Sequence, residues 1–347
     1  DYLMSILDVF RNDAFSSISL TSVVDRVPFQ PTGIGDLGLF EDLPIRTTAL
    51  AVESRDQKLV IIPTSDRGAP PTERQTEKRQ ARYFEAPRLA HGDTVYATEL
   101  QNIRQFGEES VLMQVQTEIA RRLSGPTGLT ANMEYTWELH RLAAVQGLLL
   151  DADGSVLFDW AKEFQINRAK EIGFALDAQD PELGSLRRQC NVIVRNMMRQ
   201  AQGVWLPSTR VMAMCGDDFW DALITHKDVL TTYFNWEAAK ELRKGTAFEA
   251  MDFGGISWFN YRGSNDNSTI AVATDKVKFF PQGAPGVFQR ALAPGEAVQW
   301  VNTPGLPIYI IPIFDRDRNF WWRMEAYSYP LHICTRPEIL MSGRLGK

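Results

Sequence analysis

Cysteine is scarce in this 347-residue chain, and the signals for membrane insertion and secretion are missing. Its three cysteines, Cys190, Cys215 and Cys334, lie far apart without paired spacing, which argues against a disulfide framework or a zinc knuckle and favours a reducing compartment. No run of eighteen apolar residues occurs, so no membrane-spanning helix and no membrane partner are expected. The first fifteen residues carry acids among their apolar positions and lack a basic region with a cleavage site, unlike a secretory signal peptide.

The common nucleotide and nucleophile motifs are absent as well. The sequence contains no P-loop, no dinucleotide-binding fingerprint and no nucleophile elbow, so no cofactor is expected. The net charge of −6 and the pI near 5.4 argue against a protein whose main task is to bind the phosphate backbone of nucleic acids. With 44% hydrophobic and 11% aromatic residues, the chain can form the core of one large domain or two ordinary domains.

One segment gathers side chains that are chemically able to catalyse a reaction or bind a metal. Residues 214–226, MCGDDFWDALITH, contain Cys215, Asp217, Asp218, Asp221 and His226, a set that suggests a thiol nucleophile or a metal site. Cys215 ends an apolar strand, however, and Asp217 or Asp218 at a helix start is explained by capping alone. We therefore expect no catalytic residue here, and a Cys/His hydrolase remains the rival hypothesis from another class.

Three further motifs have a structural interpretation that is simpler than the functional one. His332 and Cys334 alternate on an extended segment, but no second ligand pair is near in sequence, so no metal site is predicted. Residues 151–154, DADG, begin like a calcium loop but lack its later acidic positions, and Asp153-Gly154 favours a hairpin turn. The two tryptophans of DRDRNFWWR, residues 315–323, are able to stack on bases, but a hairpin loop with one ring turned into the core is favoured.

Periodicity predicts interleaved helices and antiparallel hairpins, which favours an α+β fold over a doubly wound sheet. Strands are expected over 47–53 and 58–63, joined by a polar turn at 54–57, and residues 79–89 and 93–100 have an extended, β-compatible pattern. Helices and further strands are expected as follows: helices over 2–15, 108–123, 130–149, 186–203 and 217–224; a strand over 209–216; a hairpin over 148–160; strand runs over 298–302 with 306–314 and over 320–329.

The stretch from 63 to 93, PTSDRGAPPTERQTEKRQARYFEAPRLAHGD, mixes both charges with prolines and cannot bury itself in the core of its own chain. If residues 47–96 form a two-stranded excursion, it projects by about 50 to 65 Å. Isolated hairpins are marginal in water, so its stability is expected to come from neighbouring copies. The alternating charges that suit pairing across subunits are Arg67, Glu73, Arg74, Glu77, Lys78, Arg79, Arg82 and Glu85. A disordered linker is the alternative.

Seven motifs, in order along the chain, carry a family resemblance. They are DRGAP at 66–70, LQNIRQFG at 100–107, EYTWELHRLAAVQGLLLDADGSVLFD at 134–159, MCGDDFWDALITH at 214–226, FGGISWFNYRG at 253–263, VNTPGLPIY at 301–309 and YPLHICTRP at 329–337. Through them the chain resembles the major capsid protein E family of tailed bacteriophages, the lambda-like branch of the Hong Kong 97 phage-type capsid fold. A minor virion protein of the same fold, such as a decoration or tail-tube subunit, is a further alternative.

The resemblance implies a division of the chain into named parts. Residues 1–46 would be an N-terminal arm and 47–96 an extended loop lying over a neighbouring subunit. Residues 97–180 would begin the peripheral domain, with a long spine helix at about 130–149. Residues 181–297 would form the axial domain, and 298–347 would complete the peripheral domain.

It also implies assembly rather than turnover: a non-enzymatic major capsid protein whose hexamers and pentamers close into an icosahedral shell around double-stranded DNA. The acidic balance would let packaged DNA slide in non-specific proximity. Implied partners, besides further copies, are a scaffold protein, a portal, a maturation protease and a decoration or cement protein. The particle would be a virion capsid assembled in the cytoplasm of a bacterial host.

The residues expected at inter-subunit contacts are Arg67, Arg74, Glu77, Arg79, Arg82, Arg104, Asn302 and Gly305. The glycines and prolines of RGAPP and NTPGLP are interpreted as backbone bends at such contacts. Some capsids of this fold are welded by Lys–Asn isopeptide bonds, and Lys58, Lys78, Asn302 and Asn319 supply the groups. Because the resemblance is to the branch that typically uses decoration proteins, crosslinking is not expected.

Overall fold

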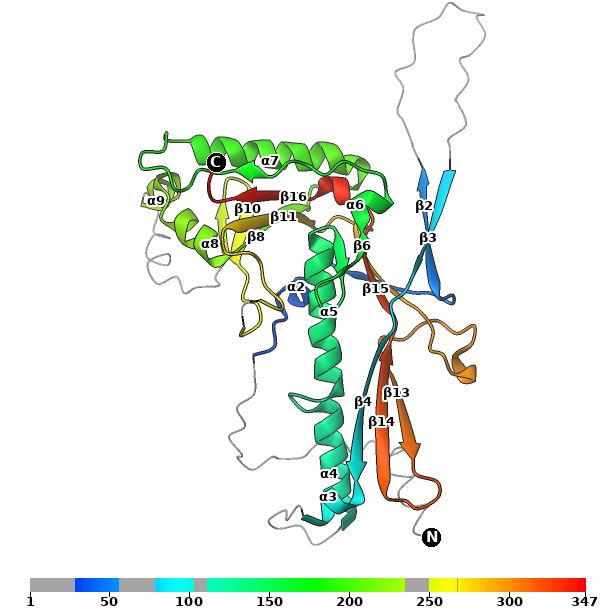
Figure 1. The fold of residues 1–347 in the computed structure, drawn as a ribbon. Coiled ribbons are helices and arrows are strands. Elements are labelled where there is room, and N and C mark those ends of the chain that lie inside the picture. The colour runs from blue at the N-terminus through cyan, green and yellow to red at the C-terminus, as the bar shows by residue number, and fades with distance from the viewer. Residues whose placement is uncertain (1–28, 56–78, 103–110, 235–249, 267) are drawn as a thin grey trace, which may run out of the picture.

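The computed structural model describes residues 29–55, 79–102, 111–234, 250–266 and 268–347 (Figure 1). Runs of consecutive strands are interspersed with helices in this part of the chain, and its strands form five separate sheets in which most neighbouring strands are antiparallel. The predicted α+β class is therefore confirmed. The predicted helix over 2–15 and strand over 58–63 fall outside the described residues.

Two helices in series form a long column through the molecule (Figure 1): α4, Val111–Ser124, and α5, Leu129–Val145. The break between them needs glycine, because a Cβ on Gly125 would lie 2.2 Å from the carbonyl oxygen of Arg121. The prediction that the second helix reaches 149 is wrong. Gly147 adopts a left-handed φ of +77°, and Leu148–Leu150 form strand β5 instead.

A six-stranded sheet lies beside the upper end of this column. Its strands, in spatial order, are β7 Ile172–Gly173, β16 Met341–Arg344, β11 Lys276–Gln282, β8 Arg210–Cys215, β10 Ile256–Asn260 and β9 Ala250–Phe253. The helices beside it are α7 Ser185–Ala201, α8 Asp217–Ile224 and α9 Lys227–Phe234. Stacked and edge-on aromatic rings from Phe174, Phe219, Trp258 and Phe279 fill its core.

Three predictions in this region are confirmed. The strand ending at Cys215 is β8, and the helices predicted over 186–203 and 217–224 are α7 and α8. The expected cap of the latter helix is wrong, because its N-cap is Gly216 and no side chain caps it. A Cβ on Gly216 would lie 2.1 Å from the carbonyl oxygen of Ala273, so close packing of the backbone fixes glycine at this position. Asp217 instead accepts a hydrogen bond from Asn260 at 3.1 Å.

A three-stranded antiparallel sheet runs alongside the lower column: β13 Tyr309–Phe314, β14 Trp321–Ser328 and β4 Leu89–Tyr96. After β4 the chain forms the short helix α3, Ala97–Asn102. Strand runs predicted over 306–314 and 320–329 correspond to β13 and β14. The run predicted over 298–302 is wrong, since Val298–Trp300 form a 3-10 turn.

Three smaller groups of strands complete the fold. β1 Glu41–Pro44 pairs in parallel with β12 Phe288–Leu292, which pairs with β15 Pro330–Cys334. β2 Ala49–Arg55 pairs with β3 Arg79–Glu85, so the polar turn predicted at 54–57 is wrong: Ser54 and Arg55 continue the strand. The predicted hairpin around Gly154 is confirmed as β5 with β6, Val156–Asp159, followed by α6, Trp160–Glu163. No helix in the described ranges is long and apolar enough to cross a membrane.

Candidate assembly surfaces

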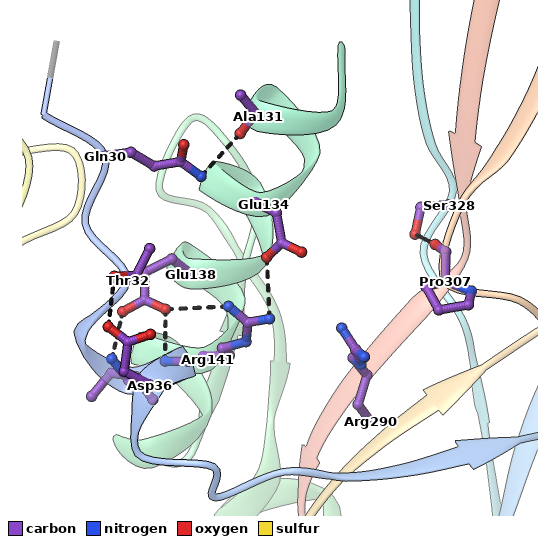
Figure 2. Close-up of polar contacts among 12 residues, drawn as sticks. Gln30, Thr32, Asp36, Ala131, Glu134, Glu138, Arg141, Arg290, Pro307 and Ser328 are labelled. Carbon is purple, nitrogen blue, oxygen red and sulfur yellow. Dashed lines mark hydrogen bonds and ion pairs between the residues drawn. The ribbon is translucent and has the colours of Figure 1, made fainter. Parts of the chain in front are cut away.

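The first described residues are fixed to the column through one buried carboxylate, that of Glu138 on α5 (Figure 2). The short helix α2, Gly33–Asp36, points its first amides at this group. The N–H of Ile34 donates to Oε1 at 2.7 Å and the N–H of Gly35 donates to Oε2 at 3.1 Å. The Tyr261 hydroxyl donates to Oε1 at 3.0 Å, and Arg141 donates to Oε2 at 3.4 Å.

The environment of Glu138 makes this a closed, water-poor junction. Burial, together with the neighbouring carboxylate, raises the pKa of Tyr261, so its hydroxyl stays protonated and donating. Arg141 also pairs with the more exposed Glu134 at 3.4 Å. Three segments far apart in sequence, α2, α5 and the strand end near Tyr261, therefore meet at one carboxylate.

A second junction, centred on Arg290 of β12, joins β1 to the column. Its guanidinium donates to both carboxylate oxygens of Asp42, each at 2.6 Å, and lies over the Trp137 ring with 4.9 Å to the ring centroid. Bidentate geometry of this kind fixes orientation as well as adding energy. Strand β1 precedes β2 in the chain. Its pairing with β12 and the Asp42–Arg290 ion pair thus hold this segment in place.

The β2–β3 ribbon stands away from the rest of the chain (Figure 1) and is anchored at its base by Phe84. Phe84 is 3% exposed and makes edge contacts with Phe158, Trp160 and Phe164 at centroid distances of 5.3 to 5.7 Å. Its neighbour Tyr83 points to the other face and is 74% exposed. Successive residues of a strand face opposite sides. Phe84 therefore anchors the ribbon, while the ring of the preceding Tyr83 is exposed to solvent.

Large apolar side chains are also exposed around the β12–β13 connection and the β13–β14 turn. They are Val298 at 90%, Val301 at 61%, Leu306 at 51% and Phe320 at 59% exposure. β13 is an edge strand of its sheet, with Ile310 and Ile313 more than one-third exposed. Exposed apolar side chains on and beside an unpaired edge strand are typical of a protein contact surface.

The structure places only some of the predicted inter-subunit residues. Arg67, Arg74, Glu77 and Arg104 lie outside the described residues, and for Arg79 only the backbone pairing with Arg55 is described. The Arg82 guanidinium lies over the Phe164 ring at the ribbon base, 5.8 Å from its centroid.

Two predicted contact residues lie in the β12–β13 connection. Asn302 occupies an exposed left-handed turn with a φ of +59°. Gly305 is buried in its own subunit: its N–H donates to Ile45, and a Cβ would lie 2.0 Å from the Leu292 carbonyl oxygen. The inter-subunit role of these residues stays a prediction.

The candidate catalytic segment does not form an exposed site. Cys215 is fully buried, and burial raises its pKa well above the usual value, so the thiol stays protonated. His226 is 6% exposed, and its Nδ1 accepts the backbone N–H of Asp228. Within the described ranges, no group of three or more histidine, cysteine or acidic residues is arranged to hold a metal.

Two buried histidines meet where α5 crosses β15. His140 is 2% exposed and His332 is 0% exposed, with ring centroids 5.6 Å apart. His140 Nδ1 and both ring nitrogens of His332 have no hydrogen-bond partner among the described residues. Burial lowers the pKa of His140 to about 4; Asp151 opposes this shift, and the Arg141 cation adds to it. Burial also lowers the pKa of His332 well below its usual value, and His140, Arg141 and Arg290 add to this shift.

We expect the free energy of unfolding to fall as the pH drops from about 6.5 towards 4, because these histidines are neutral in the fold and protonate in the unfolded chain. When folding lowers the pKa of a histidine, its contribution to stability is complete above the pKa of the unfolded chain. That contribution is lost as the pH falls toward the lower pKa of the folded chain. The slope should reach about 1.4 kcal/mol per pH unit for each histidine. Urea titrations across this range measure it, and a His332→Phe variant should flatten it; an unchanged slope would contradict the assignment.

Comparisons with known proteins give one consistent result. A family model described as phage major capsid protein E matches residues 16–345. The major capsid protein of Salmonella phage Felix O1 is 23% identical, over 95% of this chain and 96% of that protein. The major capsid protein of Pseudomonas phage KPP10 is 24% identical, over 77% of this chain and 78% of that protein. The capsid structure of the cyanophage P-SCSP1u covers 96% of this chain and 94% of its own, with a TM-score of 0.55 and 12% identity.

Proposed function

The chain belongs to the phage major capsid protein E family, and from this premise we propose that its copies assemble as hexamers and pentamers into an icosahedral shell around double-stranded DNA. Its fold is of the Hong Kong 97 phage type, like those of other solved capsids. The family is one of structural proteins rather than enzymes. The buried state of Cys215 removes the particular support for a hydrolase.

The observation that carries the assembly proposal is the β2–β3 ribbon. Phe84, Leu50 and Arg82 hold its base against the body of the subunit, while the ribbon projects away from that body with Tyr83 exposed (Figure 1). A two-stranded ribbon is marginal alone, so a neighbouring copy is the partner that would stabilise it. The exposed apolar edge from Val298 to Ile313 would be covered in the same way.

The proposed division into parts follows the one expected from the sequence, except for two strands. We assign residues 29–46 to the arm, the ribbon to the extended loop, α4 and α5 with the β13–β14–β4 sheet to the peripheral domain, and the six-stranded sheet to the axial domain. Strands β7 and β16 go with the axial domain, because β16 pairs with both β11 and β7. A scaffold protein, a portal, a maturation protease and a decoration protein are proposed partners, and assembly in the host cytoplasm is part of the same proposal.

Expression of the chain alone and with a candidate scaffold protein tests the proposal. We expect capsomer-sized rings or shells by negative-stain electron microscopy and fast-sedimenting species in the ultracentrifuge. A compact monomer at high concentration in both preparations would overturn the proposal.

Replacing residues 57–77 by Asn-Gly tests the ribbon itself. Strands β2 and β3 are kept in full, including their last pair, Arg55 with Arg79. This shortened chain should fold with an unchanged far-ultraviolet spectrum and unchanged thermal unfolding. It should lose shell closure. Normal shells from the shortened chain would show that residues 57–77 have no role in closure.

A further inference from the structure

Helix α7 has an outer face that the described part of the chain leaves uncovered. Within Ser185–Ala201 there are four arginines and no acidic residue, in a chain of net charge −6. The inward stripe is apolar and buried: Leu186, Cys190, Ile193, Met197 and Ala201. The outward face carries Arg195 and Arg199 together with Val192 and Met198, which are 50% and 45% exposed.

Two of the four arginines have partners and two do not. Arg188 pairs with Glu182 at 2.7 Å, and Arg187 lies over the Phe253 ring. Arg195 and Arg199 have no hydrogen bond or ion pair with any described residue, and they sit one helical turn apart on the same face. Like charges at this spacing repel by about 0.2 to 0.5 kcal/mol. A partner that brings negative charge would turn that cost into an attraction.

The opposite charge lies on α8 of the same sheet unit. Phe219, Trp220 and Leu223 are buried, so the outward face of α8 is formed by its acids. Asp218 and Asp221 are exposed, and their carboxylates have no hydrogen bond or ion pair in the part of the chain that the structure describes. Helix α9 follows and contacts α8, and its Leu230 is 40% exposed. The α7 face and the α8–α9 unit thus each offer charge of one sign and exposed aliphatic surface.

The two faces lie at different places on the axial unit. In Figure 1, α7 runs along the top of the six-stranded sheet, and α8 lies below its left end. Two complementary but different patches on one molecule make a heterologous contact, which repeats from copy to copy and closes into a ring when the rotation allows. Complementary charge would also select the register of this contact.

We propose that α7 of one copy docks against α8 of the next within a capsomer ring, with Arg195 and Arg199 facing Asp218 and Asp221. The inference rests on the proposed assembly function and names the surfaces that carry it in the axial domain. The acids that the sequence offered as a metal site or helix cap thereby acquire a role: they recognise a second copy of this chain.

A protein partner fits the α7 face better than packaged DNA does. Arginine and methionine are enriched in the cores of protein interfaces, whereas lysine and acidic residues are depleted there. The face contains arginine, methionine and valine and no lysine. Exposed Val192 and Met198 would gain nothing from a phosphate backbone, but they can pack against aliphatic surface such as Leu230.

Charge exchange tests the pairing. One variant carries Arg195→Glu with Arg199→Glu, a second carries Asp218→Arg with Asp221→Arg, and a third carries all four changes. The control matched to the α7 reversal, Lys162→Glu with Lys170→Glu, makes the same change in net charge at two exposed cations outside the surfaces named above. Ring yield is measured by sedimentation and electron microscopy, folding by thermal unfolding, and binding of a 20-base-pair duplex by fluorescence anisotropy.

We expect each two-site variant to fold normally and to lose ring yield by about tenfold or more. The four-site variant and the control should assemble like the parent chain. Three results would overturn the pairing: assembly unaffected by either reversal, no rescue in the four-site variant, or normal rings with duplex binding lost only on α7 reversal. Failure of the parent chain itself to form rings would instead count against the proposed function.

Discussion

Replacing Glu138 by alanine is expected to lower the free energy of unfolding by about 3 to 5 kcal/mol. The substitution leaves Arg141 buried without its inner partner, and it removes the acceptor for the Ile34 and Gly35 amides and the Tyr261 hydroxyl. Each buried donor left without an acceptor costs about 1 to 3 kcal/mol. The arm should also detach locally, since these bonds fix α2 to α5.

Urea unfolding of the dissociated subunit, followed by tryptophan fluorescence, measures the loss, and limited proteolysis between residues 29 and 46 reports release of the arm. Glu134→Ala is the matched control, because Glu134 is on the same helix, contacts the same Arg141 and is 45% exposed. It should cost less than about 1 kcal/mol. Equal losses in the two variants, or an arm that stays protected in Glu138→Ala, would contradict the junction.

Local patterns predicted the elements whose cause is local. The apolar spacing of Leu186, Cys190 and Ile193 gave α7 nearly to its ends, and Asp153-Gly154 gave the β5–β6 hairpin. The end of α5 was misplaced by about one turn, because the aliphatic residues after Gly147 continue the helical pattern although they pair as β5. Periodicity could not separate these two uses of the same residues.

Pairings between distant segments were beyond local reasoning. Nothing near Glu41 indicates that β1 will lie parallel to β12. Likewise, no local pattern indicates that β2 pairs with β3, which lies beyond the charged stretch of the sequence. Such contacts depend on tertiary packing that one window of sequence does not contain.

The assembly residues were found only in part, for the same reason. Charge alternation drew attention to the ribbon and to Arg82, but the anchoring residues Glu138 and Phe84 look like ordinary members of a helix and a strand. An acid within the apolar pattern of 130–149 was the one available signal for Glu138, since an acid is rarely buried without partners. The family resemblance supplied the function, and the geometry supplied the residues that hold the arm and the ribbon.

Replacing Phe84 by alanine is expected to cost about 3 to 5 kcal/mol and to free the ribbon from the body of the subunit. Phe84 is the one ribbon side chain that contacts Phe158, Trp160 and Phe164 together among the described ring contacts. Its removal leaves a cavity between three rigid rings, which cannot collapse easily. The lost stability is measured by urea unfolding of the dissociated subunit.

Tyr83→Ala separates anchoring from assembly. Tyr83 is adjacent in sequence but 74% exposed, so its loss should change the free energy of unfolding by less than about 0.5 kcal/mol. If a neighbouring copy covers it, Tyr83→Ala should still reduce shell yield, because a buried tyrosine at an interface often contributes about 2 kcal/mol or more.

Phe84→Ala should reduce both stability and yield. A Phe84→Ala subunit as stable as the parent chain would show that the aromatic cluster does not hold the ribbon, and a Tyr83→Ala chain that assembles fully would place the subunit contact elsewhere on it.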